Sequence, residues 1–130
     1  MEALEFRFAF YARDFDRSVR FYKEILKMPQ VGGWDRPDGK GALLSAGGSA
    51  VIEIYGPAEG KTYTGSAPVA INLALRLEDS SYVDRWYWEL ISAGVKIAGP
   101  PVDHIWGHRS FIAYDPDGIP VHFYCEISRP

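Results

Sequence analysis

The side chains best suited to chemistry in this sequence stand singly among apolar, small and tyrosine residues. Glu53 and His122 carry a carboxylate and an imidazole, which can each accept a proton as a general base or ligate a divalent metal ion. Arg7 carries a permanent positive charge, so it can pair with a carboxylate or a carbonyl group but cannot bind a metal. Asn72 offers only a weak amide oxygen. These four residues are the first candidates for a functional site.

The segments that contain these residues alternate with the period of a β-strand. In the first such segment, Phe6, Phe8 and Phe10 share one face, which we expect to pack in the core beneath a helix. The opposite faces of the strands mix small residues, tyrosines and single polar groups. That composition is typical of a partly enclosed pocket, and an ordinary solvated face is the alternative. The residues on these faces that we expect to contact a ligand are Arg7, Tyr11, Glu53, Tyr55, Asn72, His122 and Tyr124.

The order of the predicted elements repeats after half the chain. Each half has a strand, a helix and three further strands. The strands are expected at 4–11, 31–34, 42–45, 50–55, 69–77, 95–98, 110–114 and 120–126, and the helices at 14–26 and 79–93. Asp14 and Asp79, the expected helix caps, lie 65 residues apart, and Gly94 is placed to end the second helix. The sequence therefore predicts an α+β fold.

The predicted fold is one domain made of two βαβββ modules. The modules are residues 1–56 and 68–130, and the linker between them is 57–67. A chain of 130 residues has room for one domain of this kind.

Composition excludes several classes of function. There are 17 acidic and 14 basic residues, a net charge of −3, which gives no electrostatic basis for binding nucleic acid or an anionic membrane surface. No segment approaches the roughly 18 consecutive apolar residues of a membrane span. The single cysteine, Cys125, excludes an intramolecular disulfide and a multi-cysteine zinc site. We therefore expect a cytoplasmic protein whose partner is a small molecule.

The whole chain resembles the vicinal oxygen chelate superfamily, which includes glyoxalase I, extradiol dioxygenases, fosfomycin-resistance enzymes and bleomycin-resistance proteins. The resemblance is carried by the paired βαβββ halves, by the segment 14–22 (DFDRSVRFY) and by the turn 114–118 (YDPDG). It implies that each half curls into a cup, and that two halves, from one chain or from two, enclose a site. It also implies a homodimer.

The resemblance implies metal ligands on the first and last strands of each half in the enzymatic members. The matching positions here are Arg7, Glu53, Asn72 and His122. Because Arg7 would repel a divalent cation, we expect an Arg7–Glu53 pair at the metal position and no metal cofactor. The alternative is an enzyme: a lyase, isomerase or dioxygenase in which Glu53 and His122 ligate one divalent ion, or in which one of them acts as a general base.

A second set of motifs is similar to that of the metal-free bleomycin-resistance proteins, which sequester the drug without a reaction. These motifs are Val-His-Phe at 121–123 and, as a looser match, the segment 106–111 (WGHRSF). The resemblance implies that Trp106 stacks on a planar ligand; the other interpretation is that it covers a local apolar edge or a subunit interface. His104 and His108, on either side of it, are expected to be solvated loop residues.

The leading hypothesis is therefore a resistance-like protein. It would bind a small aromatic or carbonyl-containing molecule in a cup between the modules, without a catalytic metal. A module with a closed cup and a structural or regulatory role is a further hypothesis.

Overall fold

The computed structural model describes residues 1–63 and 71–128. The chain folds into two units, Met1–Ser66 and Ala67–Pro130. In the described part of the chain no helix is long and apolar enough to cross a membrane.

Unit 1 is a four-stranded sheet with one helical segment. Its elements are β1 (Phe6–Tyr11), α1 (Phe15–Val19), the π-helix η1 (Arg20–Ile25), β2 (Gln30–Arg36), β3 (Gly39–Gly47) and β4 (Ala50–Gly56). The strand order is β1-β4-β3-β2, in which β1 runs parallel to β4 and the other neighbours are antiparallel. The first and last strands of the unit are therefore neighbours.

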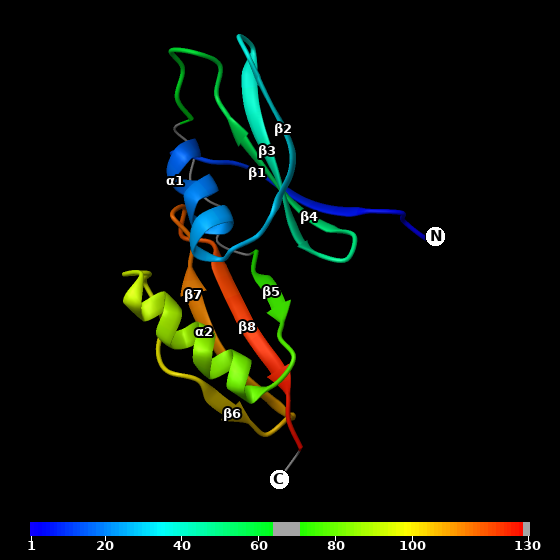
Figure 1. The fold of residues 1–130 in the computed structure, drawn as a ribbon, viewed down its shortest axis with the longest axis vertical. Helices are drawn as coiled ribbons and strands as arrows, with labels where there is room; N and C mark the ends of the chain where they lie inside the picture. Colours follow the sequence, from blue (N-terminus) through cyan, green and yellow to red (C-terminus); the bar gives the residue numbers. More distant parts are fainter. Residues whose placement is uncertain (64–70, 129–130) are drawn as a thin grey trace. The chain divides into compact units, whose positions relative to one another are not determined.

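Unit 2 repeats this topology. Its elements are β5 (Leu73–Arg76), α2 (Ser80–Ser92), β6 (Val102–His104), β7 (His108–Tyr114) and β8 (Pro120–Glu126). The strand order is β5-β8-β7-β6, again with only the outer pair, β5 and β8, parallel. Figure 1 shows α2 lying across this sheet, over β7 and β8. The predicted α+β fold with two βαβββ modules is confirmed.

Both helices begin where the sequence predicts. The carboxylates of Asp14 and Asp79 each accept a hydrogen bond, of 3.1 Å, from the backbone N–H three residues later. Hydrogen bonds from the Ser81 hydroxyl and the Tyr82 N–H lower the pKa of Asp79. Helix α2 is followed by Gly94 at φ +75°, a left-handed conformation that glycine adopts without steric cost.

The core of unit 1 lies between the sheet and the helical segment. Phe10 contacts the buried Tyr22 of η1, with ring centroids 6.0 Å apart. The prediction that Phe6 and Phe8 also pack in the core is wrong: Phe6 is 70% exposed and Phe8 is half-buried. Alternation places Phe6 and Phe8 on the same face of the edge strand β1 as Phe10, but the helical segment covers this face only at Phe10.

The core of unit 2 is formed by α2 and the covered face of β7 and β8. Phe111 and Phe123 stack with centroids 4.9 Å apart, and Tyr87 of α2 meets Phe111 edge to face. Val83 and Leu90 are fully buried on the same side of the helix. Burying each such side chain stabilises the fold by about 1.5–3 kcal/mol.

Two predicted strands differ from the structure. The segment 95–98 forms only an isolated bridge, Ile97 with Ala113, and the strand β6 comes later, at 102–104. The strand expected at 69–77 is four residues long, Leu73–Arg76, and its first two expected residues lie outside the described part of the chain.

The helix expected at 14–26 is divided into α1 and the wider π-helix η1, which apolar spacing alone does not distinguish.

Candidate functional site

An aromatic row crosses the face of unit 1 that points away from the helical segment. Trp34, Gly41, Tyr55 and Tyr11 are successive cross-strand partners on β2, β3, β4 and β1. The ring of Tyr55 lies 5.9 Å from that of Trp34 and 4.8 Å from that of Tyr11, which is 65% exposed. The ring of Tyr63 meets Tyr11 edge to face at 4.8 Å. The row gives unit 1 a partly exposed aromatic surface.

This row depends on the missing side chain of Gly41. A Cβ built there would lie 2.3 Å from Cη2 of Trp34, because the indole crosses β3 over this glycine. We expect Gly41→Ala to push Trp34 off Tyr55 and to lower the free energy of unfolding by about 1–3 kcal/mol, the usual cost of overpacking. Near-UV circular dichroism and denaturant unfolding measure both effects. Gly47→Ala, at another glycine of β3, is not a suitable control, because a side chain at its φ of +105° adds backbone strain. Ala42→Gly changes the neighbouring residue of β3 on the opposite face of the strand from Trp34, and it is the better control.

The expected Arg7–Glu53 pair is present on the same face. Nη1 of Arg7 lies 3.5 Å from Oε1 of Glu53, whose side chain is only 12% exposed. Arg7 also pairs with Glu5, and its hydrogen bond to Glu5 is the main reason that the pKa of Arg7 is raised. Burial, and then the charge of Glu53, raise the pKa of Tyr55. The permanent cation of Arg7 beside this mostly covered carboxylate does not fit a divalent metal at this position.

Unit 2 contains a cavity of about 330 Å³ on the face of its sheet opposite α2. The described residues that line it come from β5, β7, β8 and the turn between β6 and β7: Ala74, Trp106, His108, Ser110, His122 and Tyr124. Three of the predicted ligand-binding residues, Trp106, His122 and Tyr124, therefore meet at one cavity. Its side chains offer aromatic faces together with imidazole, hydroxyl and indole hydrogen-bond donors.

Two stacked pairs of rings support this cavity. Trp106, 55% exposed, stacks on His104 with centroids 4.2 Å apart and an interplanar angle of 13°. Nε2 of His104 lies 2.9 Å from the hydroxyl oxygen of Ser110. On the other side, His108 stacks on Tyr124 with centroids 4.7 Å apart.

The expectation that His104 and His108 are solvated loop residues is therefore wrong. They are half-buried and face each other as the last residue of β6 and the first of β7. All three histidines of the chain, these two and His122, belong to the cavity or to its immediate support.

The remaining candidates lie elsewhere. Asn72 is exposed just before β5 and is not among the residues that line the cavity, while Ala74 is the strand partner of His122. Val51, which alternation places on the same face of β4 as Glu53 and Tyr55, is buried. Glu53 belongs to unit 1 and His122 to unit 2, so their joint use as metal ligands or bases stays a prediction. Within residues 1–63 and 71–128 no group of three or more His, Cys, Asp or Glu side chains could hold a metal ion.

Two lining residues, His108 and Ser110, are not among those predicted to face a ligand. The signal for His108 and Ser110 is the alternation of β7, which continues two residues upstream of the strand expected at 110–114. Ala74 also lines the cavity, on the face of β5 that alternation predicts to be the pocket side.

Two βαβββ units, each with its first and last strands parallel, define the class of fold to which this protein belongs. The model of the Glyoxalase/Bleomycin resistance protein/Dioxygenase superfamily matches residues 6–123. The chain belongs to this superfamily. No curated protein matches it in sequence.

Solved structures agree with this assignment at the level of the fold. The crystal structure of SMU.1112c has a TM-score of 0.78 at 22% identity, covering 95% of this chain and 98% of its own. A glyoxylase/bleomycin resistance protein/dioxygenase domain from Frankia sp. EAN1pec has a TM-score of 0.78 at 20% identity, covering 97% and 93%. The trypanothione-dependent glyoxalase I of Leishmania major has a TM-score of 0.75 at 22% identity, covering 96% and 88%.

Proposed function

We propose that this protein binds a small, planar aromatic molecule that carries a carbonyl or carboxylate group, and that it does so without a catalytic metal. The observation that carries the proposal is the cavity of unit 2, where the exposed face of Trp106 stands beside the stacked pair of His108 and Tyr124. A flat ligand gains both apolar burial and ring stacking on such walls.

The polar groups of the cavity favour a ligand that accepts hydrogen bonds. His108, Ser110, His122 and Tyr124 can all donate, and none of the six lining residues carries a carboxylate. A ligand with a carbonyl or carboxylate oxygen satisfies these donors, whereas a strongly cationic drug meets no opposite charge in the lining. Bleomycin itself therefore does not fit this cavity.

The absence of a catalytic metal is proposed from the donor set. Of the four positions that the superfamily resemblance assigns to metal ligands, Arg7 cannot ligate and pairs with Glu53. Asn72 is a weak metal ligand, and His122 faces a cavity whose lining residues include no carboxylate. We expect Glu53 to hold Arg7 in place rather than to bind an ion.

The proposal is tested by fluorescence titration of the full chain with a panel of compounds. The panel contains 2-naphthoate and salicylate as aromatic acids, their methyl esters as carbonyl compounds, and 2-naphthylmethylamine as a cationic compound of similar shape. We expect saturable quenching of tryptophan fluorescence by the acids or the esters and none by the amine. A panel without any saturable binder, or preference for the amine, would contradict the proposed ligand class.

A further inference from the structure

The turn at the tip of the β6–β7 hairpin carries Trp106, and a hydrogen bond within the turn determines the shape of the turn. The N–H of Gly107 donates to the carbonyl of His104 at 3.0 Å, which closes the turn around Ile105 and Trp106. Gly107 has φ +92°, in the left-handed region. The N–H of Ile127 also donates to the carbonyl of Gly107 at 2.9 Å, and β7 pairs with β8 along its whole length, so this side of the hairpin is held on β8. The short edge strand β6 pairs with β7 alone.

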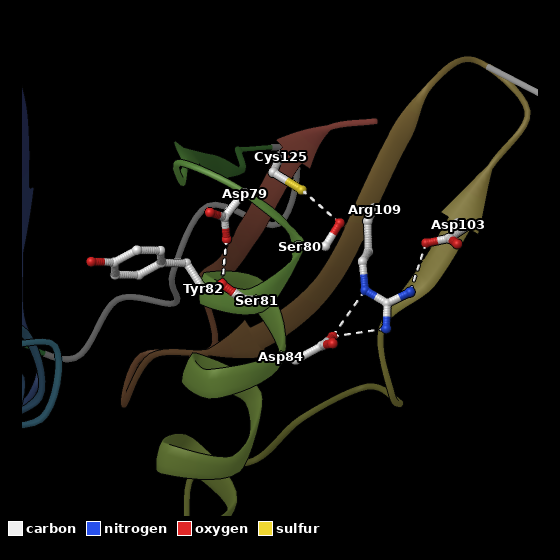
Figure 2. A network of polar contacts seen from close by, with 8 residues as sticks. All are labelled: Asp79, Ser80, Ser81, Tyr82, Asp84, Asp103, Arg109 and Cys125. Carbon is white, nitrogen blue, oxygen red and sulfur yellow. Dashed lines mark hydrogen bonds and ion pairs between the residues drawn. The ribbon is translucent and has the colours of Figure 1, made fainter. Parts of the chain in front are cut away.

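An ion-pair bridge on the opposite face of the hairpin joins both of its strands to helix α2. The Nη1 of Arg109 donates to Asp103 of β6 at 2.8 Å, while Nε and Nη2 lie 2.9 and 2.8 Å from Oδ1 of Asp84 in α2. Figure 2 shows the guanidinium of Arg109 between these two carboxylates. The hydrogen bonds to Asp103 and then to Asp84 raise the pKa of Arg109.

The bridge lies on the face of β7 opposite the cavity. Arg109 stands between His108 and Ser110, which point to the other face of β7 and line the cavity. Asp103 is the residue before His104, on which Trp106 stacks. A displacement of β6 relative to α2 would therefore move His104 and the indole stacked on it, while β7, paired with β8 along its length, stays with the core.

We propose that the Asp84–Arg109–Asp103 bridge sets the position of Trp106 relative to the remainder of the cavity, so that Arg109 is a positioning residue for the ligand site. The chemistry suits this role, because a guanidinium is planar and can engage two carboxylates at once in fixed directions. Lysine, a single point charge, cannot reproduce that geometry. The effect on ligand binding rests on the proposed function, whereas the effect on Trp106 does not.

The test uses the full chain labelled with 5-fluorotryptophan and observed by ¹⁹F NMR, with the Trp106 resonance assigned by its loss in Trp106→Phe. We expect Arg109→Met to shift or broaden the Trp106 resonance and to leave that of Trp34 in unit 1 unchanged. Arg109→Lys should restore the resonance only in part. Arg85→Met removes an exposed arginine next to Asp84 on α2 and is the matched control. If Arg109→Met fails to fold, Asp84→Asn removes only the link to the helix and serves instead.

Affinity for 2-naphthoate gives the second measurement. We expect it to fall by roughly three- to tenfold in Arg109→Met, in keeping with the modest strength of partly exposed ion pairs. A purely stabilising role for Arg109 predicts a lower Tm with unchanged Trp106 resonance and unchanged affinity, and that result would overturn the inference. If the wild-type protein does not bind 2-naphthoate, the proposed ligand class has failed, and the Trp106 resonance alone decides whether Arg109 has this role.

Discussion

Replacing Trp106 by alanine is expected to weaken ligand binding strongly while leaving the fold intact. The indole is more than half exposed and stacks on one side against His104, so its other face is free for a ligand. A large aromatic side chain at the wall of a cavity is the kind of residue whose truncation costs at least about 2 kcal/mol of binding energy, or about thirtyfold in affinity. Fluorescence titration with the aromatic acids or esters measures this loss.

Trp88→Ala is the matched control for this substitution. Trp88 is 64% exposed on helix α2, in the same unit but away from the residues that line the cavity. We expect Trp88→Ala to leave the affinity unchanged and Trp106→Phe to keep part of it, because a smaller ring still stacks. Equal affinities of Trp106→Ala and wild type would instead support the view that Trp106 covers an apolar edge or a subunit interface.

The parts of the fold that the sequence predicted correctly depend on local chemistry. Asp14 and Asp79 cap their helices through bonds that span three residues, and Gly94 ends α2 through its own conformation. Strand β6 was placed wrongly because three residues after a Gly-Pro-Pro run carry almost no periodic signal. Alternation assigned Phe6 to the correct face of β1, yet the extent of the covering helical segment is a property of packing that no local pattern contains.

The candidate site divides in the same way. Alternation placed His122 and Tyr124 on one face of β8, and the charge of Arg7, together with the strand positions that the resemblance implies, predicted its pair with Glu53. The stacking of His108 on Tyr124 arises from the register between β7 and β8, and the bridge of Arg109 joins residues 25 positions apart. Such contacts depend on tertiary structure, so the histidines beside Trp106 looked like loop residues in the sequence.

The strongest test of the metal-free proposal is the substitution Arg7→His, which we expect to create metal binding where the wild-type protein has none. It removes the cation that lies 3.5 Å from Glu53 and puts a neutral nitrogen ligand beside that carboxylate. Co²⁺ titration followed by visible absorption, and metal analysis of protein purified without chelator, measure the gain. Cysteine does not enter the expected ligand set, since Cys125 is buried in the other unit.

Two controls separate this gain from adventitious binding. Lys96→His places a new histidine at an exposed position of unit 2, where the side chain lies over the ring of Tyr114 rather than beside a carboxylate, and should bind no more Co²⁺ than wild type. Adding Glu53→Gln to Arg7→His should abolish the gain, because the carboxylate ligand is lost. Stoichiometric zinc, manganese, nickel or iron in the wild-type protein would overturn the proposal and favour the metal-dependent lyase, isomerase or dioxygenase. Because the charge of Arg7 opposes any cation beside Glu53, that outcome would require the metal to use ligands other than this pair.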